Sequence, residues 1–349
     1  MSARRGGPSG LTYRDAGVDR DAAGRAKRGI LDLLRTTAGP NVLSEPGGFG
    51  GLFRVPPGFR QPVMVASADG VGTKLKVAMR AGRHDTVGTD LVNHCVNDIL
   101  VEGARPLFFL DYIGMGKLEP GTVERIVEGV AAGCRQNGCA LLGGETAEMP
   151  DFYSPGEYDL AGFIVGMVEE DARPGPHRVR AGDVLVGVAS SGFHTNGYSL
   201  LRRLLFDRLG LDVDDPFPGI DATIGDVLLR IHRSYRPALL PLLDDGRIHA
   251  LAHITGGGIA ENVERALPEG VRATIERDSW TPPPEFRFVM EEGRIEREEM
   301  DRTFNMGVGM IVVVAAEDEA DVRRGLAQAG ESAWTLGSVV AGQRGVDLV

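Results

Sequence analysis

A charged segment rich in proline and glycine divides the chain near its middle. It reads EEDARPGPHRVRAGD over residues 169–183, a composition typical of a connector between two folded units. The 349 residues also exceed what a single hydrophobic core normally holds. We therefore expect two domains, 13–170 and 181–349, joined by a linker at 171–180 and preceded by a short disordered tail, 1–12.

Short apolar runs alternate with amphipathic stretches on both sides of this connector, which is the pattern of an α/β fold. In the first half, the predicted strands are 62–68, 106–113, 139–142 and 159–168, and the predicted helices are 86–103 and 121–136. In the second half, the predicted strands are 183–189, 306–316 and 332–340, and the predicted helices begin at 197 and span 259–267 and 317–329. Each half is therefore expected to be an α/β domain.

The composition narrows the classes of function. The formal net charge of -11 argues against binding to nucleic acid or to an anionic membrane, because both require a basic surface. Glycine, at 49 residues, has about twice its usual share of about 7%, which indicates many tight loops. The longest apolar run, 306–316, is too short to span a bilayer. The N-terminus has no apolar segment typical of a signal peptide.

The cysteines Cys95, Cys134 and Cys139 are odd in number and lack the paired spacing of a zinc site or a disulfide framework. They are interpreted as reduced, mostly buried thiols. We therefore expect a cytoplasmic protein.

Residues 69–74, DGVGTK, directly follow the apolar run 63–65. An acidic residue at a strand end, two glycines, a hydroxyl and an ammonium together form a plausible cradle for a metal-bound phosphate. The segment is neither a Walker A loop nor a GxGxxG fingerprint. Alone it is equally consistent with a simple turn, so ATP chemistry is a hypothesis that needs partners elsewhere in the chain.

One face of the helix at 86–103 carries short polar side chains at helical spacing: Asp90, Asn93, His94, Asn97 and Asp98. Such a face is often merely solvated. Short oxygen ligands suit a hard cation, however, so we favour Asp98 as a metal ligand.

Three further loops contain glycines or directly precede a helix. Residues 143–150, GGETAEMP, follow a strand end and carry Glu145, although a turn with exposed acids is the alternative. Residues 190–197, SSGFHTNG, precede a helix and form either an anion site or an ordinary N-cap. Residues 253–258, HITGGG, also precede a helix; His253 is either an acid–base group or a structural histidine.

Taken together, these motifs resemble the phosphoribosylformylglycinamidine cyclo-ligase family, the aminoimidazole ribonucleotide synthetases, from about Tyr13 to the C-terminus. The matching stretches occur in collinear order, which makes them more specific than any one alone. They are YRDAGVD at 13–19, GGFGGLF at 47–53, DGVGTK at 69–74, VNDILVEGARPLFFLDY at 96–112, GGETAEMP at 143–150, SSGFHTNGYSL at 190–200, AHITGGG at 252–258 and RTFNMGVGM at 302–310.

The resemblance implies an enzyme that uses ATP and Mg²⁺ to close the imidazole ring of 5-aminoimidazole ribonucleotide from formylglycinamidine ribonucleotide. ATP would phosphorylate the formyl amide oxygen, and the neighbouring amidine nitrogen would displace the phosphate. The family fold pairs two α/β domains, and its N-terminal strands form a barrel across a homodimer, with the nucleotide near the subunit interface.

The resemblance also implies roles for particular residues of this chain. The metal ligands would be Asp69, Asp98 and Glu145. The ATP and phosphate contacts would be Gly47, Gly48, Phe49, Gly50, Gly51, Gly70, Gly72, Thr73, Lys74, Gly143 and Gly144. The substrate contacts would be Ser191, His194, Thr195, Asn196, Gly256, Gly257 and Gly258. Lys74, His194 and His253 are the candidate catalytic residues.

Two other kinds of protein also agree with these motifs. One is a different ATP-dependent member of the same superfamily, such as a formylglycinamidine ribonucleotide synthetase, a selenophosphate synthetase or a thiamine-phosphate kinase. The other is a nucleotide-binding protein that has lost turnover. A selenophosphate synthetase usually has an N-terminal Cys or selenocysteine, which this chain lacks.

Overall fold

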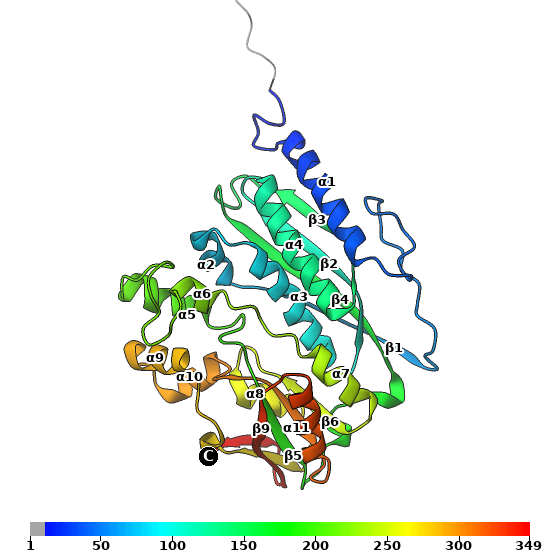
Figure 1. Cartoon of the computed structure of the whole chain (residues 1–349), viewed down its shortest axis with the longest axis vertical. Coiled ribbons are helices and arrows are strands. Elements are labelled where there is room, and N and C mark those ends of the chain that lie inside the picture. The colour runs from blue at the N-terminus through cyan, green and yellow to red at the C-terminus, as the bar shows by residue number, and fades with distance from the viewer. Residues whose placement is uncertain (1–10) are drawn as a thin grey trace, which may run out of the picture.

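The structure, a computed structural model, describes residues 11–349 and contains two β-sheets with helices packed around them (Figure 1). Of the tail predicted at 1–12, only residues 11 and 12 belong to the described part of the chain. Helix α1 (Arg20–Thr37) and the C-terminus lie at opposite ends of the molecule. None of the helices between residues 11 and 349 combines the length and the apolar character that crossing a membrane requires.

The first sheet has four strands in the order β1–β4–β2–β3. These strands are β1 (Pro62–Gly70), β2 (Arg105–Met115), β3 (Ala140–Glu148) and β4 (Tyr158–Glu169). Strands β2 and β3 are parallel, since helix α4 (Pro120–Asn137) connects them, and the other neighbours are antiparallel.

Helices α3 (Asp85–Leu100) and α4 cover one face of this sheet, and α1 packs against α4. The two helices approach closely because Gly88 and Gly129 lack side chains, and a Cβ at either position would overlap the facing backbone. Phe109 and Ile164 point into this core and are fully buried. On the opposite face, Met64 and Phe163 are exposed. One face of the sheet is therefore partly open.

The second sheet has six strands in the order β10–β7–β9–β5–β8–β6. They are β5 (Val184–Ala189), β6 (Ile248–His253), β7 (Val271–Ile275), β8 (Val308–Val314), β9 (Ala333–Ala341) and β10 (Gly345–Leu348). All seven residues of β8 are buried because helices pack on both faces of the sheet. Helix α8 (Gly258–Arg265) covers one face, and helices α7 (Arg236–Asp244) and α11 (Glu319–Gln328) cover the other.

The remaining helices lie at one side of the molecule and share the core of the first sheet (Figure 1). They are α2 (Lys74–Ala81), α5 (Tyr198–Arg202), a π-helical turn (Arg203–Arg208), α6 (Ile224–Leu228), α9 (Pro284–Gly293) and α10 (Arg297–Thr303). Phe193, Phe286 and Phe304 from these segments pack in the same apolar cluster as Phe109 of the first sheet. The hydrophobic core therefore extends beyond the boundary that the sequence predicts near residues 171–180.

The predicted α/β fold is confirmed, and the strands and helices predicted from periodicity all lie near their expected positions. Strand β3 continues beyond its predicted end at 142 to Glu148, through the glycines of the GGETAE motif. The helix predicted from residue 197 is only five residues long before it widens into the π-helical turn.

Candidate active site

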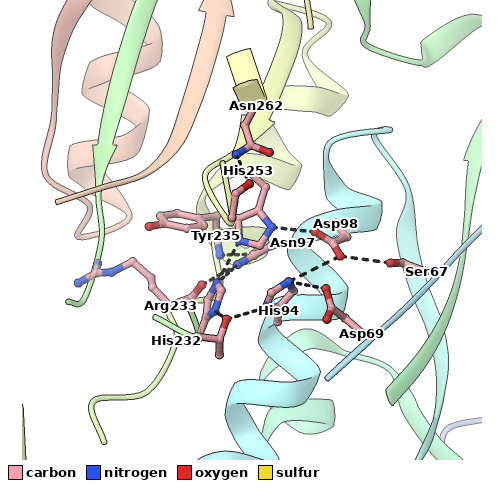
Figure 2. A network of polar contacts seen from close by, with 12 residues as sticks. Ser67, Asp69, His94, Asn97, Asp98, His232, Arg233, Tyr235, His253 and Asn262 are labelled. Carbon is pink, nitrogen blue, oxygen red and sulfur yellow. Dashed lines mark hydrogen bonds and ion pairs between the residues drawn. The ribbon is translucent and has the colours of Figure 1, made fainter. Parts of the chain in front are cut away.

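A buried polar cluster lies where helix α3 meets the C-terminal half of the chain (Figure 2). Asp69 is at the end of β1, His94 and Asp98 are one turn apart on α3, and His253 ends β6. A loop residue, His232, completes the group. Two of the motifs singled out in the sequence, DGVGTK and HITGGG, therefore meet here, together with the polar face of α3.

Each of the two aspartates in this cluster is oriented by a buried histidine. Asp69 Oδ2 lies 2.8 Å from His94 Nε2, and Asp69 Oδ1 accepts a hydrogen bond from the Gly70 amide at 2.6 Å. Asp98 Oδ1 lies 2.8 Å from His253 Nδ1. The Asp69 side chain remains 44% exposed and that of Asp98 26% exposed, so both carboxylates keep an open side.

The electrostatics favour ionised aspartates. Burial by itself would raise the pKa of Asp69, but the hydrogen bond and charge of His94 outweigh it and bring the pKa below its usual value. The pKa of Asp98 is lowered in the same way, with burial opposed by His253 and His94. Burial would lower the pKa of His94, yet its hydrogen bond to Asp69 and the nearby carboxylates raise the pKa overall. The cluster thus pairs two carboxylates with a histidine that favours its charged form.

The histidines are linked to one another as well as to the aspartates. His253 Nε2 lies 3.0 Å from His232 Nε2, and the Thr195 hydroxyl lies 2.7 Å from His94 Nδ1 and 3.3 Å from His232 Nδ1. His194 stacks on His232 with ring centroids 4.0 Å apart. Burial, followed by the surrounding positive charges, lowers the pKa of both His194 and His232 well below the usual value.

Sequence reasoning did not assign a role to His94 or His232. The sequence signal for His94 was its position four residues before Asp98, which places both on one face of the helix. His232 lies in no motif, and only the fold brings it to the cluster.

The polar face of α3 is buried, so the alternative interpretation as a solvated face is wrong. Asp90 Oδ1 accepts a hydrogen bond from the His232 amide at 2.6 Å, and Asn93 Nδ2 donates to the His232 carbonyl at 2.7 Å. Asn97 Oδ1 accepts from the Tyr235 amide at 3.0 Å. These side chains satisfy the backbone of a loop more than 130 residues away, which fixes α3 against the C-terminal half.

Lys74 is fully buried, and its ammonium group already has protein partners. Lys74 Nζ lies 2.8 Å from Asp90 Oδ2 and donates to the carbonyls of His194 at 3.1 Å and Arg230 at 2.7 Å. Burial lowers the pKa of Lys74 and raises that of Asp90, and the charge of each partner partly offsets these changes. This arrangement does not support the predicted contact between Lys74 and phosphate, because no side of the ammonium faces open space.

The other residues of the predicted substrate loops lie near this cluster but have mixed roles. His194 Nδ1 and Asn196 Oδ1 are buried without a hydrogen-bond partner among residues 11–349. Ser191 Oγ donates to the Ile231 carbonyl at 2.6 Å. Gly258 has φ +66°, and a Cβ there would overlap the Asp301 carbonyl, so packing against α10 alone requires glycine.

A cavity of about 860 Å³ lies near the other edge of the first sheet. The 44–51 segment, α1, the middle of β2 and β3, and part of β4 line it. Of the residues predicted to contact ATP or metal, it contains Gly47, Gly48, Phe49, Gly50, Gly51, Gly143, Gly144 and Glu145. Lys27 of α1 and Asp111 of β2 also line it, and sequence reasoning missed both. The cavity is thus the second candidate element of the site.

Glu145 lies in this cavity and not beside the other two predicted metal ligands. Across the sheet, Asp69 pairs with Gly162, Gly162 with Asp111, and Asp111 with Gly144, the neighbour of Glu145. Three strand spacings, about 14 Å, therefore separate Asp69 from Glu145 within one chain. The three carboxylates predicted to share a metal do not meet in this chain.

Comparison with known proteins identifies the family. Residues 57–168 match the family described as AIR synthase related protein, N-terminal domain, and residues 180–349 match its C-terminal domain. A phosphoribosylformylglycinamidine cyclo-ligase from Trichlorobacter lovleyi is 52% identical over 94% of both chains. One from Geobacter metallireducens is 50% identical over 98% of this chain and 99% of its own.

Two solved structures share the fold at low sequence identity. A thiamine-monophosphate kinase from Stenotrophomonas maltophilia has a TM-score of 0.70 and 19% identity, and covers 92% of this chain and 95% of its own. A hydrogenase maturation protein HypE in complex with ATP has a TM-score of 0.68 and 20% identity, and covers 94% of this chain and 89% of its own. The chain belongs to the AIR synthase related family and, within it, to the phosphoribosylformylglycinamidine cyclo-ligases.

Proposed function

We propose that this chain is an ATP-dependent ligase that closes formylglycinamidine ribonucleotide to 5-aminoimidazole ribonucleotide, with release of ADP and phosphate, in purine biosynthesis. The names of relatives at about 50% identity over nearly the whole chain support this reaction. The structural observation that carries it is the pair of half-open carboxylates, Asp69 and Asp98, each held by a buried histidine.

The donor set fits Mg²⁺. Asp69 and Asp98 offer carboxylate oxygens, which hard cations prefer, and each has an open side that a cation can reach. His94 and His253 would hold these oxygens in place through their hydrogen bonds. Bound Mg²⁺ would neutralise the charge of the ATP phosphates during phosphoryl transfer.

In the proposed reaction, the formyl amide oxygen takes the γ-phosphoryl group of ATP, and the amidine nitrogen then attacks the same carbon and expels phosphate. The residues of this chain bind and orient the two reactants. We place substrate contacts on the loop that carries His194 and Asn196, because Thr195 of this loop lies 2.7 Å from His94 and so beside the two carboxylates. Ser191, Thr195 and the glycines of 256–258 would shape this side of the site.

Lys74 is better suited to a positioning role than to a phosphate contact. Its bonds to Asp90 and to the carbonyls of His194 and Arg230 tie the start of α2 to the substrate loops. Gly70, Gly72 and Thr73 precede it, and the Thr73 hydroxyl lies 2.9 Å from that of Ser199. This contact joins the DGVGTK segment to the SSGFHTNG loop.

We propose that the 860 Å³ cavity receives the nucleotide, with the 47–51 loop over it. The exposed apolar face that carries Met64 and Phe163 favours a homodimer in which two such sheets close into a barrel. The three cysteines are free and buried, which favours a cytoplasmic location.

The proposed function is tested by measuring ADP release from ATP with formylglycinamidine ribonucleotide, with and without Mg²⁺. We expect release coupled one-to-one to 5-aminoimidazole ribonucleotide and dependent on the cation. Thiamine phosphate and formylglycinamide ribonucleotide with an ammonia source serve as competing substrates. Turnover with one of these and none with formylglycinamidine ribonucleotide would exclude the cyclo-ligase, and binding of ATP without any turnover would indicate a nucleotide-binding protein.

A further inference from the structure

Asp111 is an isolated carboxyl group in the wall of the large cavity. It lies in the middle of β2 and is only 8% exposed. No other residue between 11 and 349 donates a hydrogen bond to its side chain. Its own backbone amide partly opposes the effect of burial, which raises the pKa of Asp111 to about 7. Because Asp111 lines the cavity and its carboxyl oxygens are not fully enclosed by protein, a ligand in the cavity can reach them.

The neighbouring strand is built to accommodate this carboxyl. Asp111 of β2 pairs in register with Gly144 of β3. A Cβ at position 144 would overlap Asp111 Oδ1 and also lie against the Asp111 carbonyl. The second glycine of the GGET motif therefore makes room for Asp111, which differs from the phosphate contact that the sequence predicts for Gly144.

The surroundings of Asp111 are mostly apolar. Much of the wall of the same cavity is formed by aliphatic side chains of α1, β2, β3 and the turn before α4. These are Ala26, Ile30, Leu34, Leu110, Leu118 and Leu142. The charged groups of the cavity are Lys27, Glu45 and Glu145, and none of them forms an ion pair with Asp111. Largely aliphatic walls with a few polar groups are typical of a pocket for a flat ligand with a polar edge.

A purine base has this shape, with apolar faces and hydrogen-bonding groups along its edge. Adenine presents an amine donor at its N6 position, where guanine presents a carbonyl oxygen. We propose that Asp111 accepts a hydrogen bond from the N6 amine of ATP and makes the cavity selective for adenine. This inference rests on the proposed function, since it takes the ligand of the cavity to be ATP.

The remainder of the cavity agrees with this orientation. Lys27 and the glycines of 47–51 line the same space and provide a cation and free backbone amides for the phosphate end of a nucleotide. Asp111 does not suit the phosphate end of the nucleotide, because a carboxylate and a phosphate repel each other. The base is therefore the part of ATP that suits Asp111.

The test compares binding of ATP, purine riboside triphosphate and GTP in the presence of Mg²⁺, measured by titration calorimetry on the full chain. Purine riboside triphosphate lacks the N6 amine but keeps the ribose and phosphates. The wild type should bind ATP about tenfold more tightly than this analogue, which is the usual effect of one hydrogen bond to a buried carboxyl. GTP should bind more weakly still.

Two variants and a control isolate Asp111. Asp111→Leu should lose about tenfold in ATP affinity and bind ATP and purine riboside triphosphate equally, whereas Asp111→Asn keeps a carbonyl acceptor and should retain the preference. Asp214→Asn, at an exposed site outside the cavity, should match the wild type. The Asn variant serves even if the Leu variant does not fold.

Other results would overturn the inference. Unchanged ATP affinity in Asp111→Leu, an equal loss for both triphosphates, or a wild type that prefers GTP would each remove Asp111 from base recognition. Ring closure by the wild type is measured separately with formylglycinamidine ribonucleotide. Absence of ring closure would refute the proposed function, whereas normal ring closure with no effect of Asp111 would refute this inference alone.

Discussion

Replacing Asp111 by Asn should stabilise the protein, and the gain should grow with pH. Asp111 has a pKa of about 7 in the folded chain, against 3.8 when unperturbed. Between these values the unfolded chain releases the Asp111 proton while the folded chain retains it, so stability falls as pH rises. The loss is complete above pH 7, where a difference of about 3 pKa units corresponds to about 4 kcal/mol.

Asparagine keeps the shape of the side chain but does not ionise, so it escapes this loss. At pH 5 the gap in unfolding free energy between Asp111→Asn and wild type should be about 1.5 kcal/mol, and by pH 8 about 4 kcal/mol. Total stabilities of proteins are only about 5–15 kcal/mol, so a change of this size is readily measured.

The assay is urea unfolding of both proteins at fixed concentration between pH 5 and pH 8.5, without nucleotide. Asp214→Asn, which changes an exposed carboxylate, is the matched control and should show a gap near zero throughout. A constant offset between Asp111→Asn and wild type would reflect altered packing. The reasoning is refuted if the gap does not widen between pH 5 and pH 8, because Asp111 would then ionise alike in both states.

Three further predictions follow from other contacts. Gly144→Ala should displace the Asp111 carboxyl and cost about 1–3 kcal/mol of stability, visible as a lower melting temperature; an unchanged melting temperature would contradict the close approach. Lys74→Met should cost about 3–5 kcal/mol, because Asp90 is left as a buried unpaired charge. Adding Asp90→Leu should recover part of that loss in unfolding experiments, unless the ion pair is unimportant. Asp69→Asn should lower kcat by about 10²-fold or more in the ADP-release assay; a near wild-type rate would rule out Asp69 as a metal ligand.

The sequence predicted the α/β fold well because strands and helices follow local periodicity. The strand at residues 308–314 is a fully buried apolar run, the strand at 62–70 begins with the apolar run 63–65, and the helix at 85–100 carries a clear amphipathic pattern. Of the short helices beside the sheets, α5 was predicted but α2, α6, α9 and α10 were missed. Segments such as Ile224–Leu228 are only about one turn long and are held by packing with distant residues.

The site was predicted less completely because it depends on contacts across long sequence separations. The motif around Lys74 suggested a phosphate contact, but its partners Asp90, His194 and Arg230 lie up to 156 residues away and occupy the ammonium. Likewise, the position of Glu145 follows from the order of strands in the sheet, which no local pattern specifies.

The polar face of α3 has a consequence for how the two halves of the chain depend on one another. Asp98 comes from one half and His253 from the other, and the Nδ2 groups of Asn93 and Asn97 donate to carbonyls of the loop that contains His232. A chain cut within residues 169–183 would therefore yield two fragments, neither of which holds an oriented carboxylate pair. Catalysis by such fragments would require reassembly, so the concentration dependence of their activity would measure how strongly this interface holds the enzyme together.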